Sequence, residues 1–290
     1  MGATDAGIDI VWAGNHDQTA VEYHKLNHPG AIHSCQDLKQ ADWSELPAHD
    51  IMFASPCCQG HSYAAGKAAK SKKADKSRST AWAPVDCLDV HNTEIGIIEN
   101  TTGFMNWRLF PAWEMALKSM GYSVSMNIVN AADLGAPQSR NRVFFVLTKS
   151  KHPLQINLPK EEHRPARDII DLEFEGHKWD LVSNKVPATQ LRVSNGRKRY
   201  GDLFLDASYG TARNGRSLDK PLGTVTTVNC HYLVNGKYIR PLNVKELAAA
   251  QTFPEDYIWP ESVTATKLMI GNAVPPLMAK KFSMAVLKAA

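Results

Sequence analysis

The stretch DIMFASPCCQGHS, residues 50–62, joins a short apolar run to a turn that carries reactive side chains. Residues 50–54 are typical of a buried strand, and the turn after them, shaped by proline and glycine, holds two cysteines. A thiol just past a strand, near backbone amides that lower its pKa, is placed as an accessible nucleophile, whereas a lone cysteine is more often a buried small hydrophobe. The next apolar run, residues 95–99, ends in Glu99. A cysteine and a glutamate at neighbouring strand ends suit attack on an electron-poor heterocycle whose ring nitrogen is protonated.

Short apolar runs alternate with helix-like segments through the first 150 residues. We predict strands at residues 8–13, 50–54, 95–99, 123–129 and 142–147, and helices at residues 17–27, 79–90 and 109–120. This interleaving indicates an α/β fold with a doubly wound, Rossmann-like parallel sheet and helices on both faces. Sheets of this kind bind ligands at the carboxyl ends of their strands, where the thiols and Glu99 are expected.

The pattern loosens between residues 164 and 240, where turn residues multiply and no long amphipathic helix is evident. We therefore predict a smaller, irregular, mostly-β module there. Helical periodicity returns at residues 244–251 and 276–289. The predicted organisation is an α/β domain at residues 1–163, the module at residues 164–240, and a segment at residues 241–290 that packs back on the first domain.

The composition excludes several classes of protein. With 43% hydrophobic and 21% charged residues, the chain is neither collagen-like nor disordered, and it has no apolar run long enough to span a membrane. The N-terminus lacks the features of a signal peptide. Five cysteines without a Cys-x-x-Cys spacing argue against a disulfide scaffold or a structural zinc site. We therefore expect a cytoplasmic protein with reduced thiols and no bound metal.

The positive charge is concentrated in two places. Residues 64–80 carry one acidic side chain, Asp75, and six basic ones: Lys67, Lys70, Lys72, Lys73, Lys76 and Arg78. A second cluster contains Lys185, Arg192, Arg197, Lys198 and Arg199. An isolated run of this kind is usually a solvated surface loop. Two such clusters, the second with no acidic residue between Asn184 and Tyr200, favour contact with a polyanion, whose counterions the lysines would displace.

Five segments resemble the motifs of DNA (cytosine-5) methyltransferases, in the order in which that family has them. They are SPCCQGHS, IIENTTGF, NAADLGAPQSRNRVFFV, RPLNVKELAAAQTFPEDY and IGNAVPP, and they extend from Ser55 to Pro276. The resemblance implies that residues 1–163 form a catalytic domain and that residues 164–240 correspond to the family's target-recognition region. It also implies that S-adenosyl-L-methionine is the cofactor and double-stranded DNA the partner, at the nucleoid.

The resemblance assigns roles to individual residues. Cys58, which directly precedes Gln59, would add to C6 of a flipped-out cytosine, while Glu99 would bind N3 and the exocyclic amine. Cys57 stands where the family usually has proline. Arg140 and Arg142 match the family's two arginines, and we expect Arg140 to help hold the base or its phosphate.

Two further sets of residues follow from the same resemblance. The expected cofactor contacts are Asn15, His16, Asp37, Leu38, Pro56, Asn272 and Val274. The expected DNA contacts are Gln59, Ser62, Lys67, Lys70, Lys72, Lys73, Arg192, Arg197, Thr226 and Thr227. The lysines among them lie where the family has a mobile loop that closes over DNA. The threonines belong to a segment that is also compatible with a plain β-strand.

The sequence departs from the family at its start. The glycine-rich motif Phe-x-Gly-x-Gly-Gly, which cradles the methionine end of the cofactor, is absent, and with it a central strand. As the explanation for the missing motif, we favour that this chain is an incomplete form of a longer enzyme. A second polypeptide that supplies the strand, and a non-catalytic relative that binds DNA, remain alternatives. A tRNA-methylating branch of the family shares these motifs, although the basic loop and the size of the module favour DNA.

Overall fold

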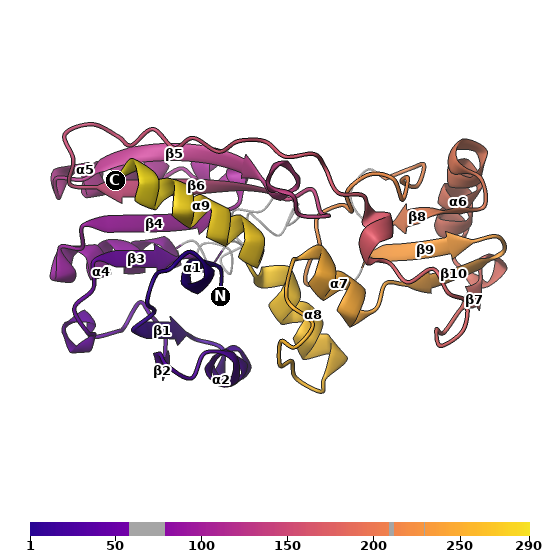
Figure 1. The fold of residues 1–290 in the computed structure, drawn as a ribbon, viewed down its shortest axis with the longest axis horizontal. Coiled ribbons are helices and arrows are strands. Elements are labelled where there is room, and N and C mark those ends of the chain that lie inside the picture. The colour runs from indigo at the N-terminus through magenta and orange to yellow at the C-terminus, as the bar shows by residue number, and fades with distance from the viewer. Residues whose placement is uncertain (58–78, 209–211, 229) are drawn as a thin grey trace.

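The computed structural model describes residues 1–57, 79–208, 212–228 and 230–290. Its helices are α1 (Gly2–Asp5), α2 (Gln18–Asn27), α4 (Ala83–His91), α5 (Phe110–Ser119), α6 (Pro187–Tyr200), α7 (Val244–Ala250), α8 (Val263–Asn272) and α9 (Pro276–Ala289). Its strands are β1 (Trp12–Asn15), β2 (Ile32–Cys35), β3 (Ile51–Ala54), β4 (Ile95–Asn100), β5 (Ser123–Asn130), β6 (Asn141–Thr148), β7 (Asp180–Leu181), β8 (Leu203–Ala207), β9 (His231–Asn235) and β10 (Tyr238–Pro241). Figure 1 shows an α/β part and a smaller β part at opposite ends of the long axis, with α7 and α8 between them.

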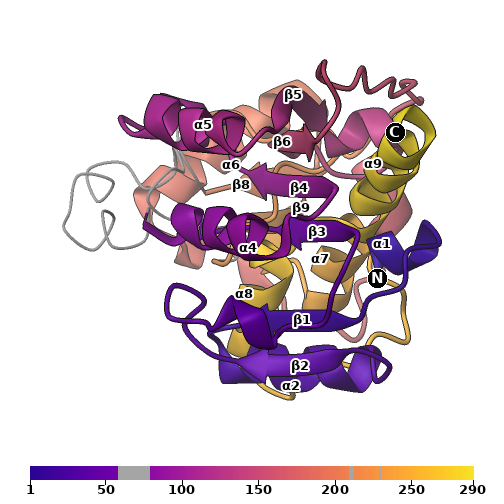
Figure 2. The ribbon, with the colours of Figure 1, turned by 90° about the vertical axis from the view of Figure 1, so that its left-hand side faces the viewer.

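The larger sheet has the strand order β3-β4-β6-β5. Alternate side chains of β6 face opposite layers: Phe145 packs with α4 and α5, whereas Phe144 packs with α9. Helices therefore cover both faces, as Figure 2 shows, and the predicted Rossmann-like α/β fold is confirmed.

The prediction of an all-parallel sheet is wrong for β6 alone, the last strand of this sheet along the chain. β3 runs parallel to β4, but β6 is antiparallel to both β4 and β5. The connection between β5 and β6, residues 131–140, contains only a short 3-10 turn at Ala131–Leu134. Because a parallel neighbour needs a longer crossover, usually through a helix, this connection returns the chain antiparallel.

A second, two-stranded sheet holds β1 parallel to β2, and the sequence analysis missed β2. None of residues 3–42 is buried, although Trp12, Leu38 and Ala41 pack partly against the main core. The ring centroid of Trp12 lies 6.4 Å from that of Trp43. Within the described residues, β1 pairs with β2 alone and β3 with β4 alone. Each of these two strands therefore has one free edge (Figure 2).

The smaller part contains an antiparallel sheet of order β7-β10-β9-β8, with α6 packed on it. The prediction of a mostly-β module without a long helix is wrong in this respect, because α6 has 14 residues. Only Val193 and Gly196 of α6 are buried, so its amphipathic pattern is too weak to recognise. A Cβ on Gly196 would lie 2.3 Å from the ring of Phe204, which explains how the helix approaches the sheet so closely.

The C-terminal helices bridge the two parts. The sequence predicted α7 and α9 but not α8. The α9 helix lies on the larger sheet, where the rings of Phe282 and Phe144 stack with centroids 4.2 Å apart. Gly2 of α1 lies against this helix, since a Cβ there would approach the Pro276 carbonyl oxygen to 2.4 Å.

Candidate active site

The turn after β3 lies beside the end of β4 because the two strands are parallel neighbours, with Ala54 opposite Ile98. The side-chain amide of Asn100 donates to the Pro56 carbonyl oxygen at 3.0 Å. The backbone N–H of Cys57 donates to the Thr80 hydroxyl, also at 3.0 Å. These two bonds hold the turn immediately before Cys58. Sequence reasoning quoted Asn100 within a motif but missed its role, and Thr80 carried no signal.

Several predicted site residues lie outside the described residues. They are the nucleophile Cys58 and the DNA contacts Gln59, Ser62, Lys67, Lys70, Lys72 and Lys73. Their assignments therefore stay predictions.

Glu99 and Arg142 form a close pair at the end of β4. Arg142 Nε lies 2.8 Å from Glu99 Oε1, and the two side chains are only 11% and 10% exposed. The pairing arises because β6 is antiparallel to β4 and sets Phe144 opposite Glu99, which brings the start of β6 to this strand end. Arg142 engages one carboxylate oxygen, and no hydrogen bond from the described residues reaches the other, Oε2. The pair can therefore present Oε2 to a ligand while the guanidinium balances the charge.

Arg140 lies apart from this pair, although the sequence places both arginines in one motif. Its guanidinium is buried and donates to the carbonyl oxygens of Val225 at 2.7 Å, Gly271 at 2.9 Å and Ala273 at 3.0 Å. The prediction that Arg140 holds the base or its phosphate remains untested, but these contacts do not favour it.

The expected cofactor contacts at the two-stranded β1–β2 sheet lie next to one another. Asn15 ends β1 and His16 follows it, while Asp37 follows β2, and the Gln36 N–H donates to the Asn15 carbonyl at 3.0 Å. Asn15 Oδ1 already accepts from the Asp17 N–H. The side chain of Asp37 is 46% exposed, with Lys39 Nζ 3.6 Å from Oδ2. An exposed carboxylate and imidazole at the ends of two parallel strands fit the hydroxyl and amine donors of an adenosine.

The other four expected cofactor contacts lie in four different environments. Leu38 packs at the edge of the core beneath α4 and α5, and Pro56 lies in the turn after β3. Asn272 is exposed at the end of α8, while Val274 packs partly against the α9 face of the sheet.

The predicted DNA contacts on α6 already have protein partners. Arg192 donates to both oxygens of Asp206, at 3.1 and 3.0 Å, and the Asp206 side chain is fully buried. Arg197 pairs with Asp202 at 3.2 Å and donates to the Gly236 carbonyl. Sequence reasoning missed Asp206, because a single aspartate in a strand has no signature.

The remaining predicted DNA contacts lie in the module's loop region. Thr226 donates its hydroxyl to the Val228 carbonyl at 2.7 Å, and Thr227 is half-buried. Thr226 and Thr227 lie in no helix or strand, so the alternative reading of this segment as a β-strand is wrong.

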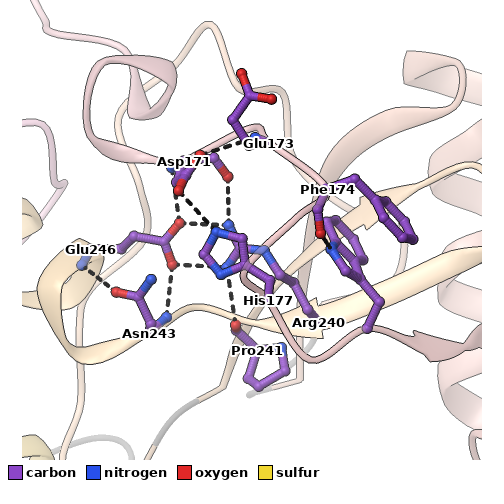
Figure 3. A network of polar contacts seen from close by, with 9 residues as sticks. Asp171, Glu173, Phe174, His177, Arg240, Pro241, Asn243 and Glu246 are labelled. Carbon is purple, nitrogen blue, oxygen red and sulfur yellow. Dashed lines mark hydrogen bonds and ion pairs between the residues drawn. The ribbon is translucent and has the colours of Figure 1, made fainter.

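A buried ion pair joins the module to α7 (Figure 3). Arg240 and Glu246 form two hydrogen bonds, of 2.9 and 2.7 Å, and both side chains are almost completely buried. Glu246 also accepts from the N–H groups of Asp171 and Asn243, which completes a capping box at the start of α7. Hydrogen bonds from the Glu173 N–H and from His177 hold the pKa of Asp171 below its usual value. This network braces the junction and is separate from the Glu99–Arg142 pair.

The described part of the chain offers no cluster of three or more histidine, cysteine or acidic side chains that could hold a metal ion. Among the helices it contains, none is long and apolar enough to cross a bilayer.

Comparisons with known proteins agree with the fold. A family model described as C-5 cytosine-specific DNA methylase matches residues 1–288. The Type II methyltransferase M.MthTI of Methanothermobacter thermautotrophicus is 27% identical over 317 residues, which cover 99% of this chain and 93% of the relative. The Type II methyltransferase M1.HphI of Haemophilus parahaemolyticus is also 27% identical, over 329 residues that cover 99% and 85% of the two chains.

Solved structures share the same architecture. A DNA modification methyltransferase encoded within a prophage of E. coli superposes with a TM-score of 0.72 at 19% identity, covering 99% of this chain and 94% of the other. The S. pombe Dnmt2 methyltransferase gives a TM-score of 0.66 at 18% identity, with coverages of 99% and 93%.

Proposed function

The chain belongs to the C-5 cytosine-specific DNA methylase family, and we propose that it transfers a methyl group from S-adenosyl-L-methionine to C5 of cytosine in DNA. The observation that carries the proposal is the buried Glu99–Arg142 pair beside a braced turn that leads into Cys58. The names of the two relatives support the same activity and a role in restriction-modification. Such a substrate would place the protein in the cytoplasm, at the nucleoid.

The protein's own residues would act on the cytosine ring in sequence. The Cys58 thiolate adds to C6, and Glu99 Oε2 accepts from the exocyclic amine and passes a proton to N3, which takes up the negative charge that builds on the ring. This makes C5 nucleophilic. After methyl transfer N3 returns its proton to Glu99 and a base removes the C5 proton. That electron pair re-forms the C5–C6 double bond, and Cys58 leaves as a thiolate. Arg142 keeps Glu99 oriented through this cycle, because it holds Oε1 at 2.8 Å.

S-adenosyl-L-methionine supplies the methyl group when it is bound. Asp37 and His16 would hold its adenosine, since both are exposed at the ends of the first two strands. Asn272 and Val274, between α8 and α9, are the further contacts that we propose.

A cytosine in a duplex hides C5 and C6 within the base stack, so the base must be flipped out at a cost of a few kcal/mol. We propose that the lysine-rich residues 64–80 neutralise phosphates around the flipped base and that the module reads the target. The alternative substrate is tRNA, so methyl transfer should be measured on both DNA and tRNA.

The test is transfer of tritiated methyl groups to unmethylated DNA and to tRNA, with the product base identified as 5-methylcytosine. Cys58→Ser should abolish transfer and Cys57→Ser should largely spare it, because only the thiol at position 58 would bond to C6. The reverse pattern would assign the nucleophile to Cys57. DNA binding without transfer by the wild-type chain would instead favour a non-catalytic relative.

A subunit of a split enzyme is the second candidate, and one observation favours it. β1 and β3 each have a free edge among the described residues, and none of residues 3–42 is buried. A further strand between β1 and β3, supplied by a second polypeptide, would pair with both edges and cover side chains such as Phe53, which is 39% exposed. Calorimetric titration of this chain with S-adenosylhomocysteine separates the cases: binding near one equivalent would show that no further strand is needed for the cofactor.

A further inference from the structure

Residues 138–140, Gln-Ser-Arg, lie immediately before β6 and place two long polar side chains in the interior. Both Gln138 and Arg140 are buried. Burying an amide or a guanidinium costs free energy unless its polar atoms are hydrogen-bonded, so the partners of these side chains indicate what they hold in place.

Gln138 connects the sheet to the module and to α7. Its Oε1 accepts from the Val225 N–H at 2.7 Å, and its Nε2 donates to Gln251 Oε1 at 2.8 Å. The backbone beside it makes a second link, because Ser139 N–H donates to the Leu222 carbonyl at 2.8 Å and Leu222 N–H donates to the Pro137 carbonyl at 2.9 Å. The module segment 222–227 is thus attached directly to the start of β6.

Arg140 extends this attachment to the end of α8. Its carbonyl partners are Val225 of the same module segment and Gly271 and Ala273 at the α8–α9 junction. One buried cation therefore binds two chain segments that flank it, and both lie far from it in sequence. Three directed bonds fix their separation more tightly than apolar packing does.

Gly271 gives independent evidence of the same contact. A Cβ at this position would lie 2.4 Å from both the Thr226 carbonyl carbon and the Thr227 nitrogen. These are backbone atoms, which cannot rotate away as a side chain would. The end of α8 and residues 226–227 are therefore in direct backbone contact, at the point where the module reaches the catalytic part.

We propose that Arg140 and Gln138 are positioning residues, which fix segment 222–227 relative to the Glu99–Arg142 pair and do not touch the cytosine. The inference rests on the proposed function. Arg142 follows Arg140 by two residues at the start of β6, so the same short stretch places Arg142 on Glu99 and the module on the sheet. The DNA-reading surface and the reacting carboxylate are thereby held in a fixed position relative to each other.

The test compares Arg140→Lys and Gly271→Ala, which disturb the contact from opposite sides. Arg140→Lys loses one or two directed bonds, and Gly271→Ala forces the backbones of Gly271 and residues 226–227 apart. Each should raise the KM for unmethylated DNA about tenfold with kcat nearly unchanged, because the segment is misplaced while Glu99 and Arg142 stay intact. Gly30→Ala is the matched control, because a Cβ at Gly30 meets nothing within 4 Å. It should leave both parameters at their wild-type values.

Thr224→Val is the replacement variant if Arg140→Lys or Gly271→Ala fails to fold. The Thr224 hydroxyl donates to the Ser139 carbonyl at 2.9 Å, and the change to valine removes that bond alone. We expect a rise in KM of about threefold. A wild-type KM in the folded variants would overturn the inference.

A fall in kcat at unchanged KM for Arg140→Lys, with Gly271→Ala unaffected, would also overturn it and would place Arg140 on the base. Failure of the proposed function gives a different result, namely a wild-type chain that transfers no methyl groups. In that case duplex-DNA binding, measured by fluorescence anisotropy, replaces KM: about tenfold weaker binding by both variants supports the positioning role, and wild-type binding refutes it.

Discussion

Replacing Arg192 by methionine should destabilise the protein without changing the electrostatic part of DNA binding. Arg192 is 15% exposed, and its two hydrogen bonds to Asp206 go to a carboxylate with no solvent exposure. Removing one partner of a buried ion pair leaves the other charge uncompensated, which costs about 3–5 kcal/mol. We therefore expect Arg192→Met to lower the free energy of unfolding by about 3 kcal/mol or more.

The assay has two readouts. Urea unfolding followed by circular dichroism gives the change in stability, and fluorescence anisotropy of a labelled duplex at several salt concentrations gives the salt slope of binding. A residue that contacts phosphate contributes about one unit to that slope, so a structural Arg192 predicts an unchanged slope. Lys198→Met is the matched control, because Lys198 is exposed on the same helix and its loss should change stability by less than about 0.5 kcal/mol.

The opposite result would refute the reasoning. If Arg192→Met unfolds at the wild-type urea concentration while the salt slope falls by about one unit, then Arg192 leaves Asp206 to reach a phosphate. A double variant, Arg192→Met with Asp206→Asn, refines the test. It should recover part of the lost stability, since the uncompensated carboxylate is then gone.

Three further predictions concern pH, charge and the turn after β3. Burial lowers the pKa of His231 from 6.5 to about 4. As the pH falls, the unfolded chain takes up this proton first, so the free energy of unfolding decreases between pH 6.5 and about 4. In urea unfolding at several pH values, His231→Gln should lack about 1.4 kcal/mol of this decrease per pH unit. Replacing Lys70, Lys72 and Lys73 by glutamine should weaken DNA binding and flatten its salt slope, whereas an unchanged slope would make them solvated surface. Asn100→Ala removes the brace on the turn and should lower kcat about tenfold in the methyl-transfer assay, with cofactor binding retained.

The sequence by itself determined those features that depend on local pattern. Residues 50–54 and 95–99 were predicted as strands, and the structure has β3 at Ile51–Ala54 and β4 at Ile95–Asn100. Their apolar runs are short, uninterrupted and bounded by polar residues, which is a signal that neighbours in the chain are enough to create. The motif order likewise identified the family, because each motif is a contiguous stretch.

Tertiary structure decided the features that depend on distant partners. The direction of β6 followed from the length of its connection to β5, and the weak apolar stripe of α6 is buried against β8. The family resemblance made Arg140 a candidate for contact with the base or its phosphate, and the resemblance together with local charge made Arg192 a candidate for contact with DNA. Their partners lie 14 residues away in Asp206 and up to 133 residues away in Ala273, and no local pattern records which buried acceptor a cation will meet. Only the fold brings those acceptors within hydrogen-bond distance. Burying a charge costs free energy unless it is hydrogen-bonded, so each buried arginine pairs with the acceptors that lie next to it in the folded protein.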